Sequence, residues 1–360
     1  MGAQENKLPL LAEIAQKGAK TMDIKGNGLS RFSCIRSLAF LSLLVLAASA
    51  FGQTCLTSDE IDPATKAALE NAGRQYFDWT SKGDTGSIRQ HSIPSLAADF
   101  GGVEAAVRDN QANFTGAQTT LRPLFVLKVE GAQPIARAEF LCGVFGKSGQ
   151  TNSSAVFVIP NLPPGDYCVV IMEVAAKTPE TLSVVLQKVG ADWKLGGYYA
   201  RPSQAGGHDG AWFRDRARQF RTKGQNHNAS MYYLKARELM VPVPFMSTME
   251  TDKLYDESQT VQVPDAPSAE NPVDVLAGGK TYRFTSIFPV GIDNDIDLVA
   301  KYQCPSVANT AQTYQDNLAA IKALVAKYPE YRDGFSAIIA RAVEPSGKDY
   351  GTMLAVKDIK

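Results

Sequence analysis

The chain is poor in the residues that most often carry metal or catalytic chemistry. It has three histidines, His91, His208 and His227, and five cysteines among 360 residues. No histidine has a second metal-ligating residue two to four positions away, and no Cys-x-x-Cys pair occurs, so the spacings of common metal sites are missing. The Gly-x-Ser-x-Gly turn of many serine hydrolases is missing too. The sequence therefore predicts no bound metal, no cofactor and no catalytic residues.

Positive and negative side chains are also balanced, so the chain has no excess of either charge. Lys+Arg and Asp+Glu number 37 each, which gives a formal net charge of zero. A strong basic excess is usual for proteins that bind nucleic acid, so we expect no nucleic-acid partner. The densest basic run lies between Arg214 and Lys223, but Asp215 interrupts it and helical spacing spreads it over more than one face. A solvated face is the favoured interpretation, and binding of an anionic envelope component or an acidic partner is the alternative.

No hydrophobic run is long enough to cross a bilayer comfortably. The longest, Leu38–Ala50, follows Arg31 and Arg36, and small residues occupy the ends of the tripeptide Ala50–Gly52. A positive segment, a short apolar run and such a tripeptide are typical of a secretory signal peptide. We expect a signal peptide at about residues 31–52, cleavage before Gln53, a periplasmic or secreted protein, and no stable membrane span after cleavage.

Two stretches rich in turn residues divide the rest of the chain. They are Arg201–Gly207 and Val261–Pro272, both poor in long apolar side chains. Because Met22 begins an ordinary signal-peptide start, we expect translation to begin there and not at Met1. The expected segments are residues 1–52, an over-extended start plus signal peptide; 56–202, a cone-like lobe; 203–262, linker and helical hairpin; and 272–360, a second lobe.

The first lobe has the pattern of one helix followed by antiparallel strands, which is an α+β arrangement. From Pro63 to about Ser81, apolar side chains recur at helical spacing, and Asp62 can cap this helix. A short helix near Gly102–Asn113 precedes six apolar runs, at Leu124–Glu130, Ala138–Phe145, Ala155–Ile159, Tyr167–Val174, Leu182–Val189 and Trp193–Tyr199. This order resembles the cystatin-like cone folds. The resemblance implies a ligand cavity inside a curved sheet, for which the candidate lining residues are Trp79, His91 and Phe100.

Two short motifs match known sites in letters but not in context. Asp84–Ser87 spells the aspartic-protease signature, yet Thr80–Gly83 replaces the apolar strand that should precede it. A turn after the helix is the better interpretation. Asp293–Asp297 resembles the start of a calcium-binding loop, but Leu298 and Cys304 stand where that loop needs Gly and Glu. We therefore expect a hairpin turn there.

Four cysteines follow the expected cleavage point, namely Cys55, Cys142, Cys168 and Cys304. In an oxidising compartment they can form two disulfides in any of three pairings. The sequence does not choose among these pairings. Cys142 and Cys168 lie in expected strands that flank a third, so their bridge is not favoured over the others.

Residues 211–240 have the pattern of two helices joined at Lys223–Gln225. Large, small and aromatic side chains recur at the steps of the tetratricopeptide repeat, in which one helix packs closely on the next. The matching residues, expected to pack the hairpin or to bind a partner, are Phe213, Ala217, Phe220, Gly224, Ala229, Tyr233 and Ala236. The resemblance covers about one repeat, so we expect a single hairpin that packs on its neighbours and not a stacked array.

The last segment has the pattern of a small ββαββ sandwich of two layers. Its expected elements are strands at Thr281–Pro289 and Ile296–Tyr302, a helix at about Thr310–Lys327, and strands at Phe335–Val343 and Thr352–Val356.

The hairpin, Gly278–Val290 and Pro345–Lys360 resemble a family of exported bacterial proteins of unknown function. This resemblance implies the architecture and no mechanism. We expect an exported, non-catalytic binding or scaffold protein of the bacterial cell envelope with a protein or envelope partner. The alternative is a small-ligand carrier or enzyme that uses a cavity in the first lobe.

Overall fold

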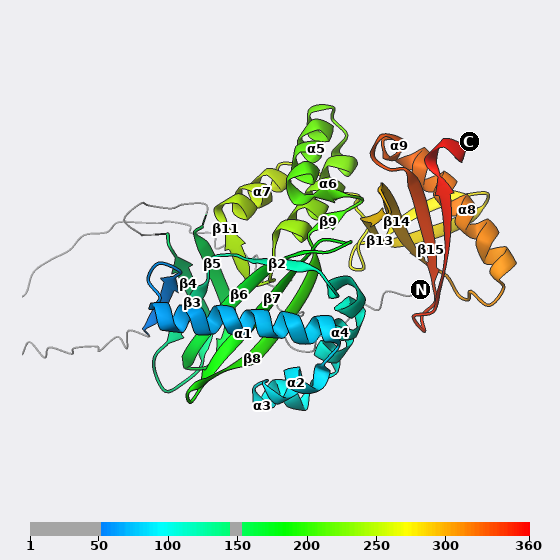
Figure 1. The fold of residues 1–360 in the computed structure, drawn as a ribbon. Coiled ribbons are helices and arrows are strands. Elements are labelled where there is room, and N and C mark those ends of the chain that lie inside the picture. The colour runs from blue at the N-terminus through cyan, green and yellow to red at the C-terminus, as the bar shows by residue number, and fades with distance from the viewer. Residues whose placement is uncertain (1–51, 145–152) are drawn as a thin grey trace, which may run out of the picture.

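A computed structural model of the protein describes residues 52–144 and 153–360 (Figure 1). In this part of the chain helices and sheets are both abundant, and the fold class is α+β, as the sequence predicts. Apart from Gly52, the expected signal peptide lies outside the described residues, as does the expected start at Met22. No described helix combines the length and the apolar character needed to cross a bilayer.

The N-terminal part contains a six-stranded antiparallel sheet and a three-stranded one. The order is β1-β3-β6-β7-β8 in the larger sheet, where β2 also pairs with β6, and β11-β5-β4 in the smaller. The strands are β1 (Gln53–Thr57), β2 (Gln118–Leu121), β3 (Phe125–Val129), β4 (Ile135–Cys142), β5 (Ala155–Leu162), β6 (Gly165–Ala175), β7 (Glu180–Val189), β8 (Asp192–Pro202) and β11 (Met246–Thr248). The helices are α1 (Pro63–Lys82), α2 (Thr85–Gln90), α3 (Pro94–Ala98) and α4 (Gly101–Phe114).

Both faces of the larger sheet are buried, which explains the unbroken apolar run in β6. Cys168 and Val170 face a core that includes α1 and α4, and α1 lies across this face in Figure 1. Val169 and Ile171 face a second core, formed with the smaller sheet. Because side chains alternate across a strand, a strand covered on both sides has no polar face. The single curved sheet expected from the sequence is therefore two sheets packed face to face.

Short polar residues fix the helix ends beside this sheet. Asp62 Oδ1 accepts a hydrogen bond from Thr65 N at 2.9 Å at the start of α1. Asp84 starts α2 by accepting from the Ser87 amide at 3.0 Å and from the Ser87 hydroxyl at 2.6 Å. Such caps satisfy amides that the first helical turn leaves unpaired. The sequence predicts a turn at Asp84–Ser87 after the first helix, and the structure has that turn between α1 and α2.

One disulfide joins the two sheets. Cys55 of β1 and Cys142 of β4 are bonded, with their Cα atoms 5.3 Å apart. Cys168 and Cys304 are free, and burial raises the pKa of the Cys168 thiol. Cys168 lies in the core on the helix side of the larger sheet and Cys142 in the core on the other side. The sheet itself therefore separates these two cysteines.

The predicted helical hairpin follows the larger sheet. It consists of α5 (Gly210–Thr222) and α6 (Asn226–Met240), and Gly224 has a φ of 73° in the connection. A third helix, α7 (Met249–Gln259), begins at a capping box between Thr248 and Thr251. The strand just before it, β11, pairs with β5 of the smaller sheet. The hairpin segment therefore returns to the N-terminal sheets before the chain continues.

The stretch expected as a linker at Arg201–Gly207 is partly ordered into strands. β8 extends to Pro202, and β9 (Gln204–Ala205) pairs with β10 (His208–Asp209). These short strands turn at Gly206 and Gly207, which both have positive φ. Gly206 lies close to the backbone of Asp295. A Cβ atom at position 206 would be 2.8 Å from the backbone oxygen of Asp295. The stretch expected as a linker therefore contains a tight hairpin, which glycines with positive φ allow.

The C-terminal sheet has five strands in the order β12-β13-β14-β15-β16. Its elements are β12 (Val273–Ala277), β13 (Lys280–Ile292), β14 (Asp295–Gln303), α8 (Thr310–Lys327), α9 (Tyr331–Gly334), β15 (Ala337–Val343), β16 (Asp349–Ala355) and the 3-10 turn η1 (Val356–Asp358). α8 connects the parallel pair β14 and β15, and the other pairs are antiparallel. The expected ββαββ unit therefore needs a correction: an additional edge strand, β12, precedes it. Asp293, with a φ of 52°, lies in the expected hairpin turn.

The hairpin and the C-terminal sheet share one hydrophobic core. Residues of α5, α6 and α8 and of β12 to β15 all belong to it. Tyr232 of α6 lies with its ring 5.8 Å from that of Phe335, next to β15. On α8, Asn317 accepts a hydrogen bond from the Tyr302 hydroxyl at 2.8 Å and donates to Thr352 at 2.9 Å. These buried contacts fix α8 and the hairpin on the sheet.

Candidate functional site

The residues of the tetratricopeptide-like pattern lie in the protein core. Gly224 occupies the turn, and each of the others is at most 1% exposed: Phe213, Ala217, Phe220, Ala229, Tyr233 and Ala236. The alanines let α5 and α6 approach, and the aromatic rings fill the space around them. These side chains pack the hairpin and are not open to a partner.

Two arginines of the basic run on α5 pair with acidic side chains of α7. Arg214 Nη1 lies 2.7 Å from Glu250 Oε1, and Arg218 Nη2 lies 2.5 Å from Glu257 Oε1. Hydrogen bonds from Arg218 lower the pKa of Glu257. Because these arginines already have carboxylate partners, an acidic ligand would have to displace α7 contacts to reach them.

None of the three candidate cavity residues of the first lobe lines either of the two pockets described here. Trp79 and His91 are neighbours, with ring centroids 4.7 Å apart, but His91 is exposed. Phe100 is buried, and the Arg89 guanidinium lies 5.8 Å from its ring. Aromatic side chains fill the space between the helices and the sheet, with Phe77 among them. The residues that the cone-like pattern suggested therefore pack the core or lie at its edge.

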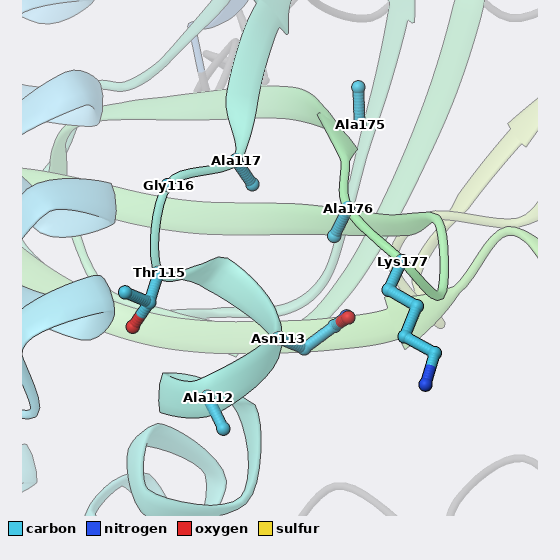
Figure 2. A pocket seen from close by; sticks show the side chains of 8 residues that line it. All are labelled: Ala112, Asn113, Thr115, Gly116, Ala117, Ala175, Ala176 and Lys177. Carbon is cyan, nitrogen blue, oxygen red and sulfur yellow. The ribbon is translucent and has the colours of Figure 1, made fainter.

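An open pocket of about 430 Å³ does occur in the first lobe, where α4 ends (Figure 2). It lies between the α4–β2 connection and the end of β6, and mostly small side chains line it. The Asn113 amide donates to Thr178 O at 2.7 Å and to Glu180 Oε1 at 2.9 Å. Its carbonyl oxygen accepts from Thr178 N. Since these polar atoms are already bonded, the pocket offers Lys177 as its one charged side chain.

A histidine joins three segments that lie far apart in the sequence. His227 Nδ1 lies 2.8 Å from Glu330 Oε1, and His227 Nε2 lies 2.9 Å from Asp265 Oδ1. Each ring nitrogen of His227 therefore lies within hydrogen-bonding distance of one carboxylate oxygen. The ring lies beside that of Tyr328, with centroids 4.4 Å apart and an angle of 46° between the ring planes. Within residues 52–144 and 153–360 no group of three or more His, Cys, Asp or Glu is placed to hold a metal ion. The contacts of His227 with Asp265 and Glu330 are called here the His227 bridge.

One carboxylate is buried in the C-terminal sheet. Asp297 is 3% exposed, and its Oδ1 has no hydrogen-bond partner among the described residues. Burial raises the pKa of Asp297, and the nearby Asp295 charge adds to this effect. A backbone hydrogen bond from Ala337 acts in the opposite direction on the pKa of Asp297 but is outweighed. No pocket described here is lined by Asp297.

A second open feature lies between β12 and α8. This groove, called here the β12–α8 groove, has a volume of about 850 Å³. Val275 and Ala277 form its strand side. Small side chains of α8 form its helix side, namely Ala319, Ala323 and Ala326. The groove therefore has an apolar floor with room for side chains from outside.

Lysines flank the groove on its helix side. Lys280 is paired with Asp316 at 2.6 Å, so these two charges offset each other. Lys322 and Lys327 of α8 are exposed, and neither forms an ion pair with a residue in the described ranges. On this side the groove therefore presents unmatched positive charge.

The strand side of the groove is a free sheet edge. β12 pairs with β13 on one side and is the first strand of the sheet. Ala277 and Lys280 flank a two-residue turn at Gly278–Gly279, where both glycines have positive φ. In such a hairpin the flanking residues form a hydrogen-bonded pair, and bonded pairs alternate along the ladder. The amide and carbonyl groups of Leu276 therefore point away from β13, as do those of Asp274.

Sequence reasoning missed this site because no strand was expected at residues 273–277, between the expected linker Val261–Pro272 and the expected strand Thr281–Pro289. The alternating apolar residues of 273–277, followed by Gly278–Gly279, are a hairpin signal that identifies the strand. The bridge at His227 has no such signal, since its partners are 38 and 103 residues away.

No protein-family model, curated protein or solved structure matches the chain.

Proposed function

We propose that the protein is an exported binding or scaffold protein of the bacterial cell envelope that acts without chemistry of its own. The observation that carries this proposal is the β12–α8 groove, an apolar floor beside a free sheet edge and unmatched lysines. Exposed strand edges are common sites of protein association. The expected partner is a protein or another envelope component.

The disulfide supports the exported setting. Cys55–Cys142 joins the two N-terminal sheets, and structural disulfides persist mainly in oxidising compartments. The signal-peptide pattern around Leu38–Ala50 agrees with this setting. Cleavage before Gln53 would leave both cysteines in the mature chain.

The hairpin supports the scaffold part of the proposal. Its segment pairs with the smaller sheet through β11, while α5 and α6 share a core with the C-terminal sheet. The His227 bridge adds charged contacts to Asp265 and Glu330. An arrangement with buried contacts on both sides holds the groove in a fixed position, which lowers the entropic cost of binding.

The test is native mass spectrometry of the mature protein, purified gently from its own envelope fraction. We expect a mass that begins at Gln53 and a co-purifying protein that the wild type retains. The double variant Lys322→Glu/Lys327→Glu should lose that protein, while Arg74→Glu, an exposed charge reversal on α1, should keep it. A reproducible small added mass without a protein partner would overturn the scaffold proposal and favour a ligand carrier.

A further inference from the structure

The chemistry of the β12–α8 groove identifies the class of partner that it fits, an inference that rests on the proposed function. We propose that an extended, acidic segment of another protein adds to the C-terminal sheet beside β12. The segment would lie along α8, between the strand edge and the lysines. Such strand addition combines main-chain hydrogen bonds with side-chain pockets on alternate residues.

The strand edge supplies the main-chain part of this recognition. The N–H and C=O groups of Asp274 and Leu276 point outward, because Ala277 and Val275 bond to β13. No backbone hydrogen bond outside the β12–β13 ladder is recorded for these two residues among the described ranges. An incoming strand therefore finds four polar groups in a row at the spacing of a β ladder.

The side chains on the two faces of β12 determine which side chains of an incoming strand would fit beside them. Val275 is buried toward the core that includes α8, so Leu276 points to the opposite face. Leu276 is 71% exposed, more than any other large hydrophobic side chain in the described residues. A neighbouring strand with an apolar residue opposite Leu276 would cover it. The next residues of that strand would face α8 and its lysines.

Charge decides between two possible occupants. A second copy of the chain would bring Lys322 and Lys327 toward the same lysines across a two-fold contact, and like charges there oppose association. An acidic segment meets the lysines with opposite charge and leaves Lys280 and Asp316 paired. The exposed Asp274 carboxylate also lines the groove, but it lies on the face of β12 opposite Val275, as Leu276 does, so the acidic face of the segment is turned away from it. The groove therefore favours an acidic partner over self-association.

Binding of designed peptides to the purified full chain tests the inference. The probe is the labelled peptide Glu-Val-Glu-Val-Glu-Val-Glu, in which one face is acidic and the other apolar, and fluorescence anisotropy reports binding. A peptide with Lys in place of each Glu tests charge. A third peptide, acidic but N-methylated on alternate backbone amides, tests strand pairing. We expect the acidic peptide to bind, and both others to bind at least about tenfold more weakly.

Variants of the chain locate the binding. Lys322→Glu/Lys327→Glu should weaken the acidic peptide about tenfold and strengthen the Lys peptide. Leu276→Pro removes an outward N–H that the β12–β13 ladder does not use, so the fold should persist while binding is lost. Leu276→Thr keeps that N–H and is the matched control. Circular dichroism checks folding. If Leu276→Pro unfolds, the lysine variant and the N-methylated peptide still test whether the peptide binds in the groove by strand pairing.

The outcomes separate this inference from the proposed function. Equal binding of the acidic and the N-methylated peptide, or no binding of the acidic peptide, overturns the inference, even if an envelope protein still co-purifies. Self-association that Leu276→Pro abolishes makes a second copy the occupant and also overturns it. Peptide binding as expected, without any co-purifying protein, supports the groove's chemistry and overturns the proposed envelope role.

Discussion

His227 Nδ1 lies 2.8 Å from Glu330 Oε1, and the same oxygen accepts from the His227 backbone amide at 2.7 Å. One carboxylate oxygen thus holds both the first turn of α6 and its side chain to the residue that precedes α9. The two side chains are each 20% exposed, so water screens this contact only partly. The docking of the hairpin on the C-terminal sheet depends on this contact as well as on the apolar core.

Replacement of Glu330 by Gln tests the contribution of its charge. Gln keeps the shape and one carbonyl acceptor but removes the charged acceptor for two N–H groups. We expect the free energy of unfolding to fall by about 1.5–3 kcal/mol, as for other hydrogen bonds to charged groups. Urea unfolding followed by circular dichroism measures this. Asp333→Asn, which changes an exposed carboxylate that accepts from Gln225, is the control and should change stability by less than about 0.5 kcal/mol. Equal effects of the two variants would contradict a special role for Glu330.

Asp265, the second carboxylate that contacts His227, makes the free energy of unfolding depend on pH in the acid range. Burial acts to raise the pKa of Asp265, but hydrogen bonds from His227 and Tyr328 outweigh it, and the pKa lies below its ordinary value. A lowered pKa in the folded state means that the carboxylate stabilises the fold above its unfolded pKa, near ~3.9. This contribution is lost as the pH falls through the lower, folded pKa.

His227→Gln should therefore remove part of the acid sensitivity. The difference in free energy of unfolding between wild type and this variant should be largest above about pH 4.5 and shrink toward pH 2.5. Urea titrations at a series of pH values measure it. His91→Gln is the control, since the exposed His91 ring contacts the Ser87 carbonyl and no carboxylate. A difference that stays constant over this range would contradict the bridge.

The disulfide makes a separate prediction about the N-terminal sheets. It closes a loop of 87 residues between β1 and β4. In the chain-entropy model such a crosslink stabilises the folded state by about 4–5 kcal/mol. The double variant Cys55→Ser/Cys142→Ser should lose much of this, and reducing agent should destabilise the wild type by a similar amount. Cys304→Ser, at a free and partly exposed thiol, is the control. If reduction leaves the wild type unchanged, the bond does not form in the purified protein.

Sequence patterns predicted the elements that local periodicity defines. The helix expected at about Thr310–Lys327 has the bounds of α8, and the hairpin connection falls at Lys223–Gln225. Capping residues also gave correct ends, as Asp62 does for α1. These features depend on neighbours within about one turn, so the sequence alone contains the information.

Contacts between distant segments were not predicted. β11 has three residues and forms only because β5 offers an edge, and the Asp265–His227–Glu330 bridge joins residues from three segments. The choice of Cys55 with Cys142 follows from which side of the larger sheet each cysteine faces. In each case tertiary packing decides, and local propensity gives no signal.

Phe220 tests whether the hairpin and the C-terminal sheet unfold together. The ring is 1% exposed and lies 4.9 Å from that of Tyr232, in the core that continues into the sheet. Phe220→Ala should lower the free energy of unfolding by about 3–5 kcal/mol, because it removes buried contacts and leaves a cavity. Leu234→Ala is the matched control on α6. The Leu234 side chain is 50% exposed, so this change should cost less than about 0.5 kcal/mol.

Amide hydrogen exchange then shows how far the effect of Phe220→Ala reaches. If one core joins the hairpin and the sheet, protection should fall in β13 and β14 as well as in α5 and α6. The larger N-terminal sheet has separate cores on its two faces, so its central strand β6 should keep its protection. Loss of protection confined to α5 and α6 would mean that the hairpin opens alone. In that case the apolar contacts with Phe335, and not only the Glu330 bridge, would be too weak to couple hairpin and sheet.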